Sequence, residues 1–222
     1  MSTLQTLDRG IRALVIVSGR PGGMSVADLA GELGVARSIC YRIVSTFISH
    51  GLLTRSADGR VFLGAAVPAL AASYWPSFLS LVTPTLHELA DRTGATAFLS
   101  VAEGEDAVAV LSIDPAAAPM IRIGYRVGSR HPLTQGAAGI AILAGRPAAP
   151  DEPEDVAVAR ARRYSITRGQ LQPGAVGVAA PIPRTGTGPN APEAALGVVA
   201  LDGFDAEAAA VVVLQAAHSL GE

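Results

Sequence analysis

Apolar residues recur at three- and four-residue intervals through the first third of the chain, which is the spacing of one helix face. The first such stretch predicts an amphipathic helix, ended by the breaker Ser-Gly-Arg-Pro-Gly-Gly at residues 18–23. Its apolar positions are Leu4, Leu7, Ile11, Leu14 and Val15.

Two more helices are predicted, over residues 26–33 and 36–49. Ser25 can cap the first of them because Asp28 stands where a capping box places its acid, and Gly34 stops that helix. The second helix has one apolar face, formed by Cys40, Ile43, Val44, Phe47 and Ile48. Two helices joined by a short turn are typical of a helix-turn-helix.

Two short β-type runs follow, at residues 52–55 and 60–63. The Asp58-Gly59 pair between them indicates a hairpin. A helix, a helix-turn-helix and a hairpin in this order predict a winged helix-turn-helix over residues 1–65.

The polar face of the helix at 36–49 carries hydroxyls, a tyrosine and arginines, and this stretch contains no acidic residue. A helix that lies in a phosphate-lined groove needs such a face, so we expect it to bind DNA, with the hairpin arginines beside it. The candidate DNA-contacting residues are Ser25, Arg37, Ser38, Ile39, Tyr41, Arg42, Ser45, Arg55 and Arg60. The same pattern also suits a protein-interaction module whose arginines are simply solvated.

The rest of the chain alternates between helical and strand patterns. Residues 66–80 predict a linker helix, with Pro68 and Pro76 near its ends and with aromatics that pack on the next domain, on a second subunit or in ordinary core. Beyond it we expect a sheet with intervening helices. The helices are expected at 84–93, 136–144, 151–163 and 206–220, the strands at 95–102, 107–113, 120–127, 176–182 and 196–201, and an exposed loop at 186–192.

Charge is distributed unevenly along the chain. Residues 1–67 hold seven Arg against four acids, whereas the remaining residues hold 10 basic against 15 acidic side chains, from totals of 17 and 19. A basic head on an acidic body fits a DNA-binding domain joined to another domain. The single cysteine, the lack of a leader pattern and the lack of a long apolar run predict a cytoplasmic protein without a membrane span.

No catalytic pattern emerges from the sequence. The four histidines, at 50, 87, 131 and 218, fit no metal-ligand spacing, and no Gly-x-Ser-x-Gly or Walker pattern occurs. We therefore expect no enzyme activity, no metal and no cofactor. An enzyme with an appended helical domain and a scaffold that uses the winged domain for protein contacts are the competing classes.

At several positions the chain resembles the IclR family of bacterial regulators. Arg-Ser-Ile-Cys-Tyr-Arg at 37–42 is similar to the family's Lys/Arg-Ser-Thr-Val-Tyr-Arg, and the other matching stretches follow in the family's order at 29–30, 34–35, 59–64, 126–128, 131–133, 137–144, 168–174 and 176–182. The resemblance implies an α+β chain with a winged helix-turn-helix (1–65), a linker helix (66–80) and a GAF-like effector-binding domain (81–222). It also implies homodimers or tetramers, often repressors, on double-stranded DNA operators.

A small-molecule site is expected in the C-terminal domain. Gly136-Ala137-Ala138 opens a helix whose free N–H groups favour an anion, and Arg122, Arg126, Arg130 and Arg168 are candidate carboxylate partners. The resemblance implies a small organic or aromatic acid as effector. Gln170 stands where the family often has an acid, and the family's small polar pair falls on Ala200 and Asp202. The expected effector-binding residues are thus Arg126, Gly136, Ala137, Ala138, Arg168, Gln170, Gly177, Ala200 and Asp202.

Overall fold

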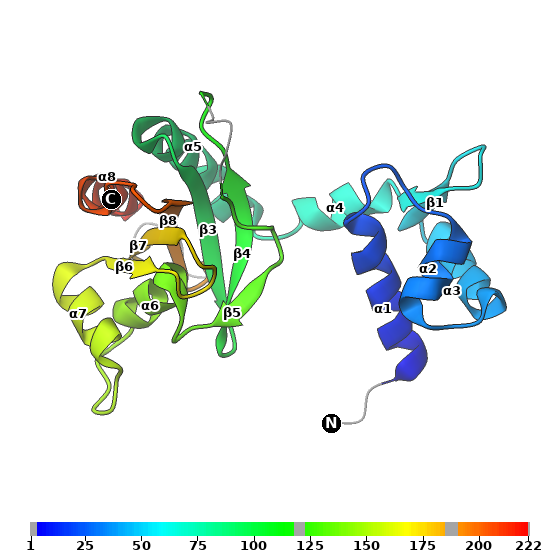
Figure 1. Ribbon diagram of the computed structural model, residues 1–222, viewed down its shortest axis with the longest axis horizontal. Helices are drawn as coiled ribbons and strands as arrows, with labels where there is room; N and C mark the ends of the chain where they lie inside the picture. The colour runs from blue at the N-terminus through cyan, green and yellow to red at the C-terminus, as the bar shows by residue number, and fades with distance from the viewer. Residues whose placement is uncertain (1–3, 118–122, 185–190, 222) are drawn as a thin grey trace. The chain divides into compact units, whose positions relative to one another are not determined.

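The computed structural model describes residues 4–117, 123–184 and 191–221. The chain divides into two compact units, Met1–Pro76 and Ser77–Glu222 (Figure 1). This division lies inside the segment that the sequence assigns to the linker helix. None of the helices in the described ranges is both long and apolar enough to cross a bilayer.

The first unit contains the predicted helix-turn-helix. Its helices are α1 (Gln5–Ser18), α2 (Val26–Leu33) and α3 (Arg37–Ser49). The Ser25 hydroxyl accepts a hydrogen bond from the Asp28 N–H at 3.1 Å and donates to its carboxylate at 2.7 Å, which caps α2. Gly34 ends α2 in the left-handed conformation (φ 66°). The core beneath these helices includes Ala13, Leu29, Leu33, Cys40, Val44 and Val61.

The predicted hairpin is the wing. Strands β1 (Leu53–Arg55) and β2 (Val61–Leu63) pair antiparallel, with Arg55 opposite Val61. Met24 forms a bridge with Val61, which attaches the wing to the segment before α2. The backbone of Gly23 is left-handed (φ 63°), which favours glycine, and the Phe62 ring lies where a side chain at this position would project.

The apolar face of α1 is exposed. An amphipathic helix ordinarily buries its apolar stripe, yet α1 buries Gly10, Ala13 and Val17. The side chains of Leu4, Leu7, Ile11 and Val15 are all more than half exposed. Gly10 fits closely against the helix-turn-helix, within reach of the Phe47 ring, and Leu14, Ile16 and Val17 also pack on its core. Leu4, Leu7, Ile11 and Val15 remain outside this packing.

The linker prediction is wrong in its boundaries. The predicted helix at 66–80 is α4 (Ala66–Ala72) followed by a break, and α5 (Pro76–Thr93) begins at Pro76 and continues through Pro84. Trp75 in the break has φ 39°, which a helix does not accommodate. Pro76 suits the first turn of a helix because its missing N–H would have no partner there. None of the α4 side chains is buried.

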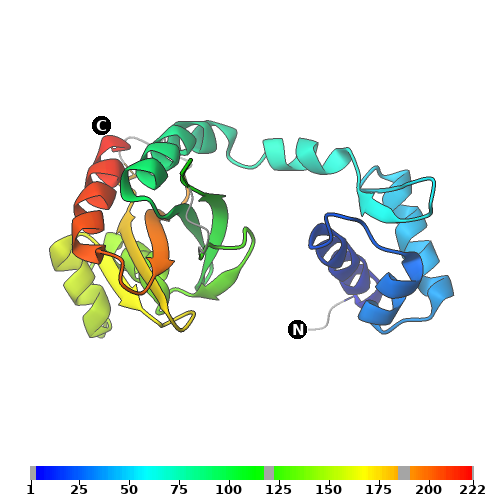
Figure 2. The ribbon, with the colours of Figure 1, turned by 45° about the horizontal axis from the view of Figure 1, so that its top comes forward.

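A six-stranded antiparallel sheet forms the centre of the second unit, in the order β5-β4-β3-β8-β7-β6. The strands are β3 (Thr96–Glu103), β4 (Asp106–Ile113), β5 (Arg130–Pro132), β6 (Ser165–Arg168), β7 (Ala175–Pro181) and β8 (Ala194–Leu201). Helices α6 (Gly136–Gly145) and α7 (Glu154–Arg162) lie on one side of the sheet, and α5 and α8 (Ala206–Ser219) on the other (Figures 1 and 2).

The core on the α6 side includes Phe98, Ala137, Ala141, Ala195 and Val199. Side chains of α5 and α8 meet on the opposite side, where Arg92 donates to Gln215 at 2.8 Å. Successive side chains of a strand point to opposite faces of the sheet, so both faces are covered by a layer of helices.

Two strand predictions need correction. The predicted strand at 120–127 falls partly outside the described residues, and its described part, 123–127, is irregular. β4 pairs with β3 on one edge, and the strand on its other edge is β5, which pairs through Arg130, His131 and Pro132. Strand β6 was not predicted, because its four residues directly follow a helix and are too few to show a period. Residues 186–190 of the predicted loop lie outside the described part.

Candidate nucleic-acid interface and ligand cavity

The outer face of α3 is open to solvent. Arg37, Ser38, Ile39, Tyr41, Arg42 and Ser45 are all exposed, while Cys40, Ile43 and Val44 on the opposite face are buried. No acidic residue occurs in α3, so this face carries the charge of two arginines without internal neutralisation. It therefore has the form and the sign that a phosphate-lined groove requires.

The side chain of Arg55 extends this face from the wing. Its guanidinium carbon lies 5.5 Å from the centroid of the Tyr41 ring, within the range of a cation–π contact. The exposed Arg55 thus joins Tyr41 of α3 in one surface, although the two residues come from different elements.

Two predicted DNA contacts have structural roles. Arg60 donates from Nε to the Gly22 carbonyl at 2.9 Å and from Nη2 to the Gly23 carbonyl at 2.6 Å. Ser25 is occupied in capping α2. The sequence places both residues in the right region, but it does not show that their polar atoms already have partners within the unit.

A cavity of about 360 Å³ lies on the α6 side of the sheet. Its floor includes Thr167, Gly177 and Val199 from three adjacent strands, and its walls come from residues 123–131 and from the turn between β6 and β7. The lining is Ile123, Gly124, Tyr125, Arg126, Ser129, Arg130, His131, Thr167, Gln170, Leu171, Gln172, Ala175, Gly177 and Val199. Such a mixture of apolar walls and a few polar groups is typical of a small-molecule site.

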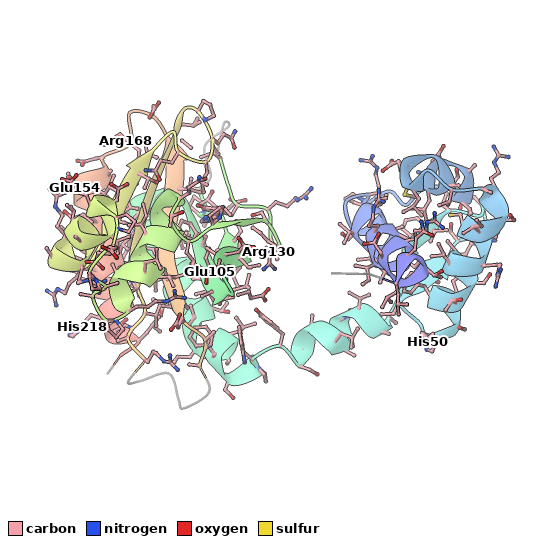
Figure 3. All side chains as sticks on the ribbon, turned by 90° about the horizontal axis from the view of Figure 1, so that it is seen from below. His50, Glu105, Arg130, Glu154, Arg168 and His218 are labelled. Carbon is pink, nitrogen blue, oxygen red and sulfur yellow. The ribbon has the colours of Figure 1, made fainter. Side chains whose placement is uncertain are left out.

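The candidate carboxylate partners have different surroundings. Arg126 lines the cavity. Arg130 also lines it, but its guanidinium is paired with Glu103 at 2.7 Å and with Asp106 at 3.2 Å, and these hydrogen bonds raise its pKa. Arg168 lies outside the lining, and Figure 3 shows it apart from Arg130. Arg122 is outside the described residues.

The first N–H of α6 already has an acceptor. Gly136 donates to the side-chain oxygen of Gln170 at 2.8 Å. Leu171, which follows Gln170, also lies close to Gly136. A Cβ atom at position 136 would be 2.5 Å from the Cδ1 of Leu171. Gln170 and Leu171 therefore fasten the β6–β7 turn to the start of the helix, at the edge of the cavity.

Tyr125 and His131 supply further polar groups to the cavity. Burial raises the pKa of Tyr125 to about 12, so its phenol stays neutral at physiological pH. The Nδ1 atom of His131 lies 3.1 Å from the Pro132 carbonyl oxygen, and its Nε2 has no protein partner among the described residues. Neither residue was among the predicted effector contacts.

Six of the nine predicted effector residues lie outside the cavity lining, namely Gly136, Ala137, Ala138, Arg168, Ala200 and Asp202. Val199 faces the cavity, and its neighbour Ala200 belongs to the opposite face because adjacent strand residues point to opposite sides. Asp202 is exposed beyond the end of β8. Ala138 is buried in the core on the α6 side. Ala137 lies behind the lining, where its Cβ limits the space at Gly177.

The missed lining residues carried a weak signal in the sequence. Thr167 pairs with Gly177 across β6 and β7, so recognition of β6 would have placed Thr167 beside a predicted contact. Tyr125 and His131 lie in irregular or very short segments, where periodicity gives no side-chain direction. Across the described ranges, no three His, Cys, Asp or Glu side chains gather as a metal site would require.

Comparison with known families gives two matches. Residues 6–57 match the IclR helix-turn-helix domain, and residues 77–169 match the C-terminal domain of the bacterial transcriptional regulator IclR. The HTH-type transcriptional regulator Rv1719 of Mycobacterium tuberculosis is 30% identical over 145 residues, which are 65% of this chain and 55% of that protein. The transcriptional repressor IclR of Escherichia coli is 25% identical over 144 residues, 64% of this chain and 53% of that protein. The chain thus spans about half the length of these curated relatives.

Solved structures share the fold. An IclR homolog from Microbacterium hydrocarbonoxydans, complexed with 4-hydroxybenzoate, superposes with a TM-score of 0.77 at 21% identity and covers 97% of each chain. The IclR protein of Thermotoga maritima gives a TM-score of 0.73 at 19% identity, over 99% of this chain and 100% of that one. These likenesses extend over both units.

Proposed function

Because this chain belongs to the IclR family of bacterial transcriptional regulators, we propose that it binds a double-stranded DNA operator and regulates transcription in the cytoplasm in response to a small organic or aromatic acid. The observation that carries the DNA-binding part is the exposed, acid-free outer face of α3. This face inserts into the major groove, where Arg37 and Arg42 contact phosphates or guanine edges and Ser38, Ile39 and Ser45 set the register, while Tyr41 lies beside the wing arginine Arg55.

The DNA-binding protein is a homodimer in this proposal. The stripe formed by Leu4, Leu7, Ile11 and Val15 on α1 is an apolar surface of the kind that a second subunit covers. A two-fold axis through it repeats the unit and presents two α3 helices to successive turns of a near-palindromic operator. Two such dimers can pair as a tetramer on longer operators.

The effector site is the cavity on the α6 side of the sheet. Arg126 is the cation available to a carboxylate, since Arg130 is already paired with two acids. The carboxylate of the ligand replaces the side-chain oxygen of Gln170 as the acceptor of the Gly136 N–H, and the apolar walls hold the body of the ligand. A small aromatic acid fits the cavity volume of about 360 Å³, and 4-hydroxybenzoate, the ligand of the Microbacterium protein, is the first compound to test.

Arg42→Ala tests the DNA-binding part. Footprinting on the intergenic DNA beside the gene of this protein defines the operator, and anisotropy titrations at several salt concentrations give the affinity. If Arg42 reads a base, we expect the variant to lose about 1–3 kcal/mol of specific binding, and if it holds a phosphate, the salt slope falls by about one. Arg162→Ala removes the same charge from α7 in the other unit and should bind like the wild type. Wild-type binding that ignores salt concentration would contradict the proposal.

The effector part is tested by a thermal-shift panel of small acids, followed by operator titration with each compound that stabilises the protein. An effector must bind the DNA-bound and free states with different affinity, because otherwise it shifts nothing. We therefore expect a stabilising acid to change operator affinity. Stabilisation without any such change would separate ligand binding from regulation and contradict this part.

A further inference from the structure

At the protein surface, one pair of side chains connects the wing with the recognition helix α3. Arg55 is the last residue of β1, and its guanidinium carbon lies 5.5 Å from the ring centroid of Tyr41. Both side chains are exposed, and Tyr41 keeps 49% of its surface open to solvent. The contact is therefore a surface contact and not part of the core.

The tyrosine ring is the partner that fixes Arg55. Within the described ranges, no carboxylate forms an ion pair with Arg55, in contrast to Arg20, whose guanidinium lies 2.9 Å from Glu32. A cation over a ring face is attracted by the ring quadrupole. Because the ring meets one side of the guanidinium, the N–H groups along its edge remain available to an acceptor.

Arg60, the other wing arginine, shows the contrast. Its Nε and Nη2 donate to the carbonyls of Gly22 and Gly23, so two of its five N–H donors are used within the unit. The β1–β2 turn is also held internally, where the Ser56 hydroxyl donates to the Arg60 carbonyl at 3.0 Å. Arg60 thus attaches the turn end of the hairpin to the segment before α2, while Arg55 is oriented toward α3.

We propose that Tyr41 is a positioning residue for Arg55. The ring holds the guanidinium beside the outer face of α3, so that Arg55 binds one DNA phosphate through its planar fork without losing further rotamer freedom. This rests on the proposed function, since it describes how the DNA-binding surface is organised. It assigns to Tyr41 an effect that operates through Arg55.

A double-mutant cycle separates this role from a direct contact. The variants are Tyr41→Leu, Arg55→Ala and the double variant, with Tyr41→Phe as the matched control that keeps the ring. Binding to the footprinted operator and to a random duplex of equal length is measured by anisotropy between low and moderate salt. Thermal unfolding of every variant is recorded alongside, because both positions are exposed and we expect no change in stability.

The expected result is a coupled pair. Arg55→Ala should weaken binding to both duplexes equally and lower the salt slope by about one. Tyr41→Leu should weaken binding by roughly two- to five-fold, the range of a surface cation–π contact. The same change in the Arg55→Ala background should then have no effect, and Tyr41→Phe should match the wild type.

Other outcomes would overturn the inference. Additive losses would show that Tyr41 contacts DNA by itself, and a loss in Tyr41→Phe equal to that in Tyr41→Leu would show that the hydroxyl is what matters. A loss in Arg55→Ala confined to the operator would exclude a phosphate contact. The proposed function fails separately, when the wild-type protein binds neither duplex at low salt.

Discussion

The guanidinium of Arg60 donates to the carbonyl oxygen of Gly23 at 2.6 Å and so ties the wing to the turn before α2. The sequence suggests a DNA contact at this position, but the geometry gives Arg60 a structural role. The two arginines of the hairpin therefore differ, because the guanidinium of Arg60 is hydrogen-bonded within the unit and that of Arg55 lies beside the Tyr41 ring.

Arg60→Ala should therefore act on stability more than on DNA binding. We expect the first unit to lose about 1–2 kcal/mol of unfolding free energy, because charge-assisted hydrogen bonds to two carbonyls are removed. The salt slope of DNA binding should remain that of the wild type. Chemical denaturation and anisotropy measure the two effects, and Arg12→Ala on the exposed side of α1 is the matched control. An unchanged stability with a salt slope lower by one would show that Arg60 is a phosphate contact after all.

A glutamate on the exposed stripe of α1 should dissociate the proposed homodimer. Ile11→Glu places a charge at the centre of an apolar interface, where its desolvation is costly. Sedimentation velocity should then show a monomer at concentrations at which the wild type is dimeric. Val211→Glu, at an exposed apolar position of α8, controls for the added charge. If Ile11→Glu sediments like the wild type, the subunits associate through another surface.

Gln170→Ala should tighten binding of an acid effector. The variant frees the Gly136 N–H from its internal acceptor, and we expect a gain of about 1 kcal/mol, or roughly five-fold in affinity. Calorimetry with the best acid from the thermal-shift panel measures it. Gln172→Ala, a second glutamine of the same turn that also lines the cavity, should leave the affinity unchanged. Weaker binding in Gln170→Ala would mean that Gln170 contacts the ligand directly.

Tyr125 should ionise well above the ordinary pKa of a tyrosine. Its pKa in the folded state is about 12 against an ordinary value of 10.0, because burial disfavours the phenolate. The unfolded chain loses this proton first, so the contribution of Tyr125 to stability is complete below pH 10 and is lost as the pH rises toward 12. Absorbance titration of the wild type and Tyr125→Phe should differ only in the step near pH 12. If the two titration curves differ near pH 10 instead, the phenol of Tyr125 is exposed to water and not buried.

Two buried serines should respond oppositely to removal of their hydroxyls. Ser165 donates to the Ala137 carbonyl at 2.6 Å, so Ser165→Ala should cost about 1 kcal/mol. Ser100 is fully buried, and its hydroxyl has no protein partner among the described residues, so Ser100→Ala should leave stability unchanged or raise it slightly. Thermal unfolding of the two variants compares them directly, and an equal loss in both would reveal a partner for Ser100.

Local periodicity was sufficient to predict the helix-turn-helix and wing. The spacing of Cys40, Ile43 and Val44 identifies the buried side of α3 and therefore its open side, although Ile48, which the sequence assigns to the same face, is exposed. The same reasoning describes α1 incompletely, because the pattern shows that Leu7 and Ile11 share a face but not what covers that face. An apolar stripe that packs against a second chain and one that packs in the core have the same residue spacing in a single sequence.

The cavity was harder to predict for a geometric reason. Its lining comes from adjacent strands that are distant in the sequence, and strand parity decides whether a residue faces it. The sequence places Ala200 in the site, whereas the neighbouring residue Val199 is the one that lines the cavity. Gly136 and Gln170, which the sequence suggests as effector contacts, are hydrogen-bonded to each other and lie at element ends, whose positions turn and breaker residues mark.

The break between α4 and α5 also has an optical consequence. Trp75 is the only tryptophan of the chain, and its ring centroid lies 4.6 Å from that of Tyr74. Selectively excited emission therefore comes from a single fluorophore at the junction of the two compact units, with no background from elsewhere. Any rearrangement of that junction by an operator or an acid is reported by the native protein, without a dye or an engineered label.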